Sequence, residues 1–173
     1  LNVLSALALG SALNMPMEGL IEGAKQYRGL PHRCELIGQV NGVRFIDDSK
    51  GTNIGATSAA LEGLSGAGQI WLIIGGQGKG QDFSQLKPVL ARINARLLVM
   101  GEATAEICAH LGQDAPIDVM SSLEDAVNLS AASAQPGDIV LLSPACASFD
   151  MFTGYVERGE RFQAAVAALE VAA

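Results

Sequence analysis

The sequence is poor in the residues that build disulfide frameworks and zinc sites. Its 173 residues include three cysteines, Cys34, Cys108 and Cys146, and two histidines, His32 and His110. The cysteines lie far apart and form no CxxC pair, and the histidines add no zinc-ligand spacing. We therefore expect neither a disulfide framework nor a structural metal site, and this cysteine usage is typical of a reducing cytoplasm.

Long apolar runs and an excess of basic residues are also lacking. Apolar runs such as residues 70–74 and 139–142 are strand-length, far short of the roughly 18 residues that a membrane span needs. The net charge of -7 argues against binding to nucleic acid, so any phosphate must be held by locally placed groups. We expect no membrane partner and, since no signal-peptide pattern is present, no export.

What is present indicates a compact fold, with 49% hydrophobic and 17% charged residues. Leucines at helical spacing predict a helix over residues 2–14, and Pro16 can start a second helix that runs to Gly29. The segment "GLPHR" (29–33) breaks this pattern, so we expect a domain boundary there, with residues 1–29 separate from residues 30–173. Because Leu1 falls inside the first helical pattern, we expect a piece of a longer polypeptide.

Beyond residue 33 the sequence alternates between strands and helices. Asn41-Gly42 between two apolar runs (34–40 and 43–47) predicts a β-hairpin. Helices are predicted at 54–63, 83–91, 102–111, 122–133 and 157–170, and strands at 69–74, 96–100, 116–119 and 138–142. This alternation predicts an α/β fold: a Rossmann-like, mostly parallel sheet with helices on both faces and an N-terminal β-hairpin, preceded by two helices.

Three polar loops follow the predicted strands: "DDSKGTN" (47–53), "GGQGKGQDF" (75–83) and "SPACASFD" (143–150). In open α/β sheets, ligands bind outside the carboxyl ends of the strands. We therefore expect these loops to meet at one edge of the sheet and to form a site there.

The first two loops offer cations beside exposed backbone. In "DDSKGTN", Thr52 or Asn53 can cap the next helix, and Lys50 adds positive charge beside its first N–H groups. The alternative is a well-capped turn that binds no ligand, and this loop taken alone favours that interpretation. In "GGQGKGQDF" the glycines allow close approach of a ligand to Lys79, but Gly80 follows that lysine, so this is no Walker A loop. The alternative here is a flexible connection.

The third loop does not read as a nucleophile site. There is no GxSxG elbow and no histidine paired with Ser143, Cys146 or Ser148. Cys146 is expected to be a buried small side chain, and the serines to form hydrogen bonds. His32 and Arg33 fit either an ordinary surface or a nucleotide contact.

The last helix carries charged side chains at spacings of three and four residues. We expect a solvated, mutually paired face formed by most of Glu157, Arg158, Glu160 and Arg161.

Taken in order, "GLPHR", "NGVRFIDDSKGTN", "GGQGKG", "LLSPACASFD" and "ERG" resemble the carboxyl-terminal part of the Mur ligases, over essentially the whole chain. "DDSKGTN" is shared with folylpolyglutamate synthases, whereas "SPACASFD" points to the branch that adds D-glutamate. The resemblance implies a cytoplasmic, ATP-dependent ligase of peptidoglycan precursor synthesis. In it the carboxylate of UDP-N-acetylmuramoyl-L-alanine is phosphorylated and the acyl phosphate is attacked by the amine of D-glutamate.

The resemblance also implies roles for individual residues. ATP and Mg²⁺ would be held mainly by a central domain whose tail is residues 1–29, so this chain alone would be inactive and supply no metal ligand. The expected roles are ATP contact for Asn2, His32, Arg33 and Asp48, proximity to the transferred phosphate for Lys50, and D-glutamate binding for Thr52, Lys79, Ser148, Phe149 and Tyr155.

Three positions depart from the family pattern. Gln77 stands where an acidic residue is expected, which removes a salt bridge that would fix Lys79. Phe149 and Tyr155 replace an expected leucine and phenylalanine and keep the bulk. Two alternatives stay open: a related ligase with a different acceptor, and a nucleotide-binding domain without catalysis.

Overall fold

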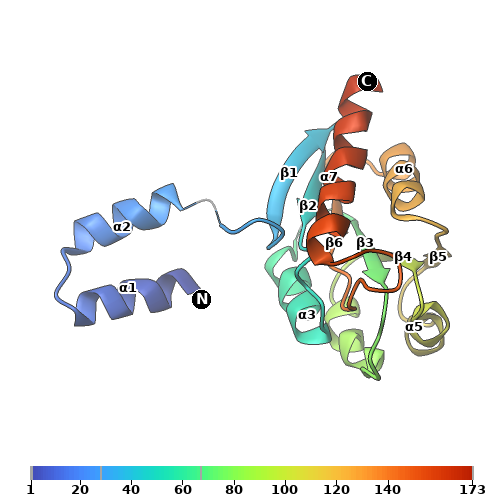
Figure 1. The fold of residues 1–173 in the computed structure, drawn as a ribbon, viewed down its shortest axis with the longest axis horizontal. Helices are drawn as coiled ribbons and strands as arrows, with labels where there is room; N and C mark the ends of the chain where they lie inside the picture. The colour runs from blue at the N-terminus through green and yellow to red at the C-terminus, as the bar shows by residue number, and fades with distance from the viewer. Residues whose placement is uncertain (1, 28, 67, 173) are drawn as a thin grey trace. The chain divides into compact units, whose positions relative to one another are not determined.

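A computed structural model describes residues 2–27, 29–66 and 68–172, except for the side chains of Asn2 and of residues 170–172. The chain divides into two compact units, Leu1–Leu30 and Pro31–Ala173. Figure 1 shows the elements of each unit. Among the described residues, no helix combines the length and apolarity needed to cross a membrane.

The first unit is a pair of helices, α1 (Asn2–Ala12) and α2 (Met17–Gln26). The two helices approach closely at Gly10, where an added Cβ atom would lie 2.5 Å from Leu20. The turn between them passes through Asn14, which has a left-handed backbone (φ 56°). Large apolar side chains such as Leu4, Leu9 and Leu13 are exposed, and the pair encloses an apolar groove of about 560 Å³.

The second unit is a six-stranded sheet in the order β1-β2-β6-β3-β4-β5. The strands are β1 (Glu35–Val40), β2 (Val43–Asp47), β3 (Ile70–Gly75), β4 (Ala95–Met100), β5 (Ile117–Val119) and β6 (Ile139–Leu142). Only β1 pairs antiparallel with its neighbour, across the Asn41-Gly42 turn, in which both residues have positive φ. The predicted hairpin and the mostly parallel sheet are confirmed.

Helices cover both faces of this sheet, as predicted. α3 (Ile54–Gly63), η1 (Phe83–Leu86), α4 (Lys87–Leu90) and α5 (Thr104–Leu111) pack on one face, and α6 (Leu123–Ser133) and α7 (Tyr155–Ala172) on the other. Side chains of β3 alternate between the two cores: Ile70, Leu72 and Ile74 point to one, Trp71 and Ile73 to the other. This is the pattern of a strand buried on both faces.

The helix predicted over residues 83–91 is present, but it is not a single α-helix. A 3-10 turn covers Phe83–Leu86, and only Lys87–Leu90 is α-helical. Asp82 caps the 3-10 turn by accepting a hydrogen bond from the N–H of Ser84 (3.0 Å). Pro88 has no N–H to give to the carbonyl four residues earlier, so a continuous α-helix loses a bond at this point.

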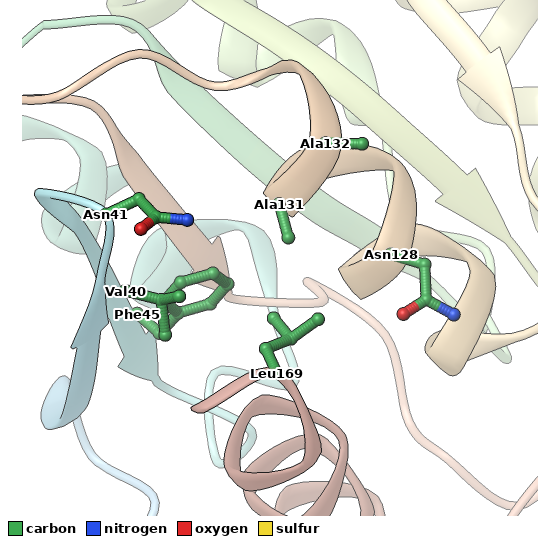
Figure 2. A pocket seen from close by; sticks show the side chains of 7 residues that line it. All are labelled: Val40, Asn41, Phe45, Asn128, Ala131, Ala132 and Leu169. Carbon is green, nitrogen blue, oxygen red and sulfur yellow. The ribbon is translucent and has the colours of Figure 1, made fainter. Parts of the chain in front are cut away.

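A small cavity lies away from the strand ends that carry the polar loops. It has a volume of about 280 Å³ and is lined by the hairpin turn, α6 and the end of α7 (Figure 2). Its floor is apolar, with Phe45 and Leu169, and the amides of Asn41 and Asn128 stand at its rim. It therefore takes no part in the site described next.

Candidate active site

The three polar loops meet at the carboxyl edge of β2, β6 and β3, which are neighbours in the sheet. The N–H of Ala145 donates to the carbonyl of Gly51 (2.8 Å), which joins the third loop to the first. Gln77 and Ala147 exchange backbone hydrogen bonds of 2.9 and 3.1 Å, which join the second loop to the third. The predicted convergence is confirmed.

Glycines let these loops pass one another closely. At Gly76, φ is 122°, and an added Cβ atom would stand 2.3 Å from the carbonyl oxygen of Ala147. Any larger residue would push the second loop away from the third. The glycine-rich stretch is therefore required by close backbone packing, whatever the loop binds.

The start of α3 is capped from two sides. Of the two candidate caps, Thr52 and Asn53, it is Asn53 that forms the N-cap, and its side chain accepts a hydrogen bond from the N–H of Ala56 (2.9 Å). The N–H of Ile54 donates to Oε1 of Gln81 (3.1 Å), a residue of the second loop. Two of the N–H groups expected to attract an anion are therefore already occupied by side chains of the protein.

Asp48 is buried and ties the first loop to its surroundings. One carboxylate oxygen accepts from Ser143 Oγ (2.7 Å), and the other from the N–H of Cys34 (3.2 Å). Burial raises the pKa of Asp48, and these hydrogen bonds oppose the rise. Part of its hydrogen-bonding capacity is thus used inside the fold.

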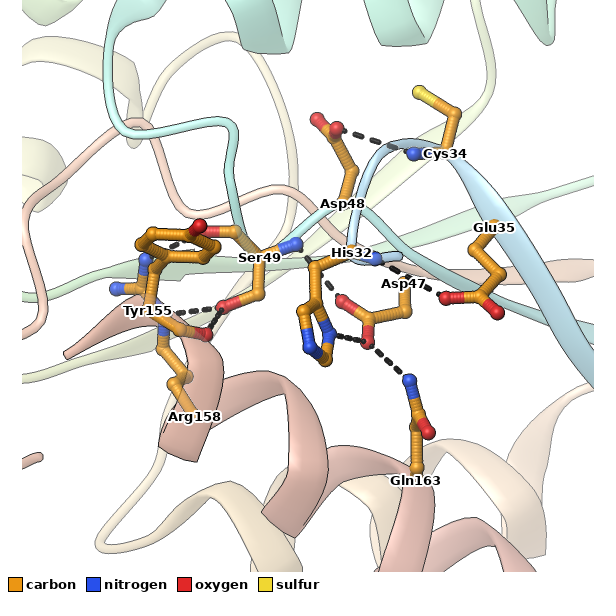
Figure 3. A network of polar contacts seen from close by, with 9 residues as sticks. All are labelled: His32, Cys34, Glu35, Asp47, Asp48, Ser49, Tyr155, Arg158 and Gln163. Carbon is orange, nitrogen blue, oxygen red and sulfur yellow. Dashed lines mark hydrogen bonds and ion pairs between the residues drawn. The ribbon is translucent and has the colours of Figure 1, made fainter. Parts of the chain in front are cut away.

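His32 and Asp47 form a buried pair beneath the first loop (Figure 3). Nδ1 of His32 lies 2.8 Å from Oδ2 of Asp47, which also accepts from Nε2 of Gln163 on α7 (2.9 Å). The backbone of His32 is left-handed (φ 59°), and its carbonyl accepts from the N–H of Lys50 (3.0 Å). His32 is therefore held in place against the loop that carries Lys50.

Together with Glu35, this pair is the group of potential metal ligands found among the described residues, with ligand atoms within 4.8 Å of one another. These residues are already hydrogen-bonded to one another: Nδ1 of His32 pairs with Asp47, and Glu35 accepts from the backbone N–H of His32 (3.1 Å). Mg²⁺ needs near-octahedral oxygen ligands, which this buried, mutually bonded group does not resemble. We assign no metal to it.

Arg158 is the exception to the solvated face that was expected for most charged residues of the last helix. It is 1% exposed, and its guanidinium donates to Oγ and the carbonyl of Ser49 (3.0 and 2.8 Å) (Figure 3). It also donates to the carbonyl of Cys146 (3.2 Å). Burial lowers the pKa of Arg158 to about 10, so the group stays charged at neutral pH. It joins α7 to the first and third loops.

The rest of the charged face of α7 pairs in ways other than those expected. Arg161 binds Glu124 on α6 (2.6 Å), and Glu157 accepts from the N–H of Thr153 (2.6 Å). Cys146 is fully buried, as predicted, and burial raises its pKa to about 12, which disfavours a reactive thiolate.

Lys50 lies against the ring of Tyr155, with Nζ 3.9 Å from the ring centroid. His32 meets the same ring edge-on, at a centroid distance of 6.2 Å. The carbonyl of Tyr155 accepts from Ser49 Oγ (2.7 Å), which fixes the start of α7 beside the first loop. The structure thus brings together Lys50, His32 and Tyr155, which the sequence assigned to three different roles.

Lys79 forms a second cationic point on the same edge. It is exposed, with Nζ 5.8 Å from the centroid of the exposed ring of Phe149. Lys79 and Gln77 line a cavity of about 520 Å³ together with Glu102 and Glu106. Position 77 carries no acid, but Glu102 and Glu106, from the segment after β4, line the same cavity as Lys79.

The remaining residues with expected roles are placed as follows. Ser148 is buried, and its carbonyl accepts from the N–H groups of Met151 and Phe152. Thr52 is half-buried and Arg33 is exposed. Asn2 is the first residue of α1, and its side chain lies outside the described part of the chain.

Sequence reasoning missed four residues that hold the site together: Gln81, Arg158, Gly159 and Gln163. An added Cβ atom at Gly159 would lie 2.2 Å from Nδ1 of His32, so α7 can pack here only with a glycine. The pair Arg158-Gly159 within "ERG" was the one available signal, since a glycine inside a helix normally costs stability and calls for a packing reason.

A Rossmann-like sheet with two lysine-bearing loops over its carboxyl edge fits a domain that binds anionic substrates. The family model described as "Mur ligase, glutamate ligase domain" matches residues 32–146, and the chain therefore belongs to this family. The resemblance stated from the motifs is confirmed.

Among curated relatives, the UDP-N-acetylmuramoylalanine–D-glutamate ligase of Acinetobacter baylyi is 49% identical over 97% of this chain and 39% of its own length. Relatives from Marinobacter nauticus and Chromobacterium violaceum carry the same name at 48% identity. The chain thus spans about two fifths of the length of the relatives that it matches.

Solved structures support the fold. UDP-N-acetylmuramate-alanine ligase from Thermotoga maritima superposes with a TM-score of 0.71 at 14% identity, over 99% of this chain and 37% of that chain. The MurF ligase of the same organism, solved in complex with ADP, gives 0.64 at 18% identity, over 96% and 37% of the two chains.

Proposed function

We propose that this chain is the carboxyl-terminal part of an ATP-dependent ligase that joins D-glutamate to UDP-N-acetylmuramoyl-L-alanine in peptidoglycan precursor synthesis. The observation that carries the proposal is the single edge at which the loops bearing Lys50 and Lys79 are joined by hydrogen bonds. Identity of 48–49% to ligases of that name supports the choice of D-glutamate. The cysteine usage of the sequence agrees with the cytoplasm as its compartment.

In this proposal Lys50 faces the transferred phosphate. An ammonium group there stabilises the negative charge of the acyl phosphate, and it favours the neutral form of the attacking amine. Tyr155 lies on the other side of that ammonium, so its ring would border both the phosphate and the acceptor.

D-Glutamate is a dicarboxylate and needs two anion-binding points. We assign one to Lys79 with Thr52, and the other to Ser148 with neighbouring backbone N–H groups, with Phe149 and Tyr155 as the apolar walls. A hydrogen bond to a charged group contributes roughly 1.5–3 kcal/mol. Removal of Lys79 should therefore weaken acceptor binding by about 10- to 100-fold.

ATP is assigned to His32, Arg33, Asp48 and Asn2, and a structural neighbour solved with ADP supports a nucleotide in this fold. Asp48 accepts two hydrogen bonds within the fold and keeps further lone pairs for a ligand.

We propose that residues 1–29 are the tail of a preceding ATP-binding domain, which would hold the P-loop and most Mg²⁺ ligands, and that residues 30–173 bind the acceptor. The exposed leucines of α1 support packing against further chain.

The test is ADP release by the full-length polypeptide with UDP-N-acetylmuramoyl-L-alanine and a panel of D-glutamate, L-glutamate, L-alanine and meso-diaminopimelate. We expect turnover with D-glutamate alone. Lys79→Ala should raise the KM for the acceptor more than the KM for ATP, whereas Lys87→Ala, which removes a lysine paired with Asp114, should change neither. Turnover with another amino acid would retain the ligase and overturn the acceptor assignment.

A further inference from the structure

The side chain of Gln81, in the glycine-rich second loop, makes three hydrogen bonds, two of them outside its own loop. Its Oε1 accepts from the N–H of Ile54 (3.1 Å), at the start of α3. Its Nε2 donates to the carbonyls of Gly78 (3.0 Å) and Ala145 (2.8 Å). One amide group therefore connects the second loop to the third loop and to the start of α3.

The orientation of this amide is determined by its partners. Two of them are carbonyl oxygens, which can only accept, and the third is an N–H, which can only donate. Exchanging the oxygen and nitrogen of Gln81 would place an oxygen against two oxygens and an N–H against an N–H. All three contacts would then be repulsive, so the amide has one satisfactory position.

The hydrogen bonds of Gln81 lie beside two residues other than glycine that have a left-handed backbone, Lys79 and Ala145. Lys79 and Gly80 have φ values of 53° and 70° and form the centre of a turn closed by the N–H of Gln81 and the carbonyl of Gly78 (3.2 Å). Ala145, whose carbonyl also binds Gln81, has φ of 57°. A residue other than glycine costs energy in this region and persists only where its surroundings hold it.

We propose that Gln81 is the positioning residue for Lys79, an inference that rests on the proposed role of Lys79 in acceptor binding. The backbone N–H of Gln81 closes the turn, and its side chain anchors that turn to α3 and to the third loop. This fixes where the ammonium of Lys79 stands relative to Phe149. Without the side chain, the turn keeps one hydrogen bond and Lys79 relaxes away from its strained conformation.

A simple capping role for Gln81 predicts something different. If only the N–H of Ile54 mattered, Gln81→Glu would preserve activity, since a carboxylate at a helix start is favourable. The positioning role predicts the opposite, because a carboxylate oxygen would face the carbonyls of Gly78 and Ala145. Gln81→Glu and Gln81→Ala should then both be damaging.

The test uses the full-length ligase with Gln81→Ala, Gln81→Glu, Lys79→Ala and the double variant Gln81→Ala/Lys79→Ala. We expect each Gln81 variant to raise the KM for D-glutamate about tenfold, with kcat and the KM for ATP within about twofold of the parent. In the Lys79→Ala background the effect of Gln81→Ala should vanish, because the residue acts through Lys79. Gln85→Ala, an exposed glutamine on the following turn, is the matched control.

Additive effects of the two alanine substitutions, or an equal rise in the KM for ATP, would overturn the inference. Amide hydrogen exchange in the same proteins gives a second readout that needs no turnover. Gln81→Ala should speed exchange at the N–H groups of Ile54 and Gln81. Unchanged exchange there refutes the positioning role even if the ligase proves to use another acceptor, whereas faster exchange with no D-glutamate turnover refutes only the proposed substrate.

Discussion

The packing of α7 against the site requires that residue 159 has no Cβ atom. Its α-carbon faces the buried pair of His32 and Asp47, and an added Cβ atom would lie 2.2 Å from Nδ1 of His32 and 2.9 Å from Asp47. Neither partner can move freely, because His32 is held by backbone hydrogen bonds and Asp47 by Gln163. The helix that carries Gly159 can therefore pack here only without a side chain.

Gly159→Ala should lower the free energy of unfolding by about 2 kcal/mol, as expected for overpacking. Denaturation of the 173-residue chain in urea measures this. Gly154→Ala is the matched control, since an added Cβ atom there meets nothing within 4 Å. Equal effects of the two substitutions would show that α7 shifts easily and that His32 is not tightly packed.

Asp48 predicts a pH dependence of stability. Burial raises its pKa in the folded state, so the folded protein binds this proton more tightly than the unfolded chain does. The contribution of Asp48 to stability is therefore fully present below its unfolded pKa of about 4 and is lost as the pH rises through its folded pKa. Asp48→Asn removes that dependence, so the variant should gain stability relative to the parent as the pH rises from about 4 through the folded pKa of Asp48.

Urea unfolding at several pH values checks this. Asp82→Asn is a control for which the stability difference from the parent should change with pH in the opposite direction, because hydrogen bonds from Ser84 lower the pKa of Asp82. The parent should then gain stability over that variant as the pH rises. If the difference in the free energy of unfolding between Asp48→Asn and the parent does not change with pH, burial affects this carboxylate less than the structure indicates.

At single positions, sequence patterns predict local chemistry better than tertiary roles. The cap formed by Asn53 and the turn at Asn41-Gly42 follow from nearby residues alone, and the structure confirms both. The tasks of Gln81 and Gly159 depend on partners distant in the chain. No local pattern indicates such partners, so only the folded structure assigns these tasks.

Among the elements, α7 is bound to the site by Arg158. The guanidinium is buried and donates to the carbonyls of Ser49 and Cys146, which lie in different loops. Without the guanidinium of Arg158, both carbonyls would lose these hydrogen-bond donors. Charge-assisted hydrogen bonds of this kind are about twice as strong as neutral ones.

Arg158→Met should therefore lower the free energy of unfolding by about 3 kcal/mol, through unpaired buried acceptors. Arg161→Met, which breaks an ion pair with Glu124 on the outside of α7, should cost less than about 1 kcal/mol. Urea denaturation of both variants makes the comparison. A similar small loss for each would mean that water reaches the carbonyls when Arg158 is removed.

Element boundaries were predictable where hydrophobic periodicity and turn residues agree, as for α3 and β3. The change from a 3-10 turn to an α-helix within residues 83–91 has a physical cause, because Pro88 interrupts the hydrogen bonds of a continuous α-helix. Arg158 could not be singled out as the buried exception on this face for a related reason. Spacing of charges along a helix shows which residues share a face, but it does not show that a charged residue is buried against distant carbonyls.

For the molecule as a whole, the proposal implies that the 173 residues fold but release no phosphate from ATP when substrates are added. No Walker A motif is present in the sequence, and the lysine of the glycine-rich loop is followed by Gly80. Circular dichroism would report folding, and a phosphate-release assay with UDP-N-acetylmuramoyl-L-alanine, D-glutamate and ATP would report turnover. Substrate-dependent phosphate release by this chain would contradict the proposal that a preceding domain is needed to bind and hydrolyse ATP.

The position of β6 has a consequence for how the protein is made. This strand comes last in the chain yet lies between β2 and β3, so until it is synthesised the sheet consists of two separate pieces. Each piece presents an open edge that β6 later covers. The nascent chain on the ribosome therefore holds two unpaired strand edges until its last strand emerges, and this interval is when aggregation or chaperone binding should be greatest.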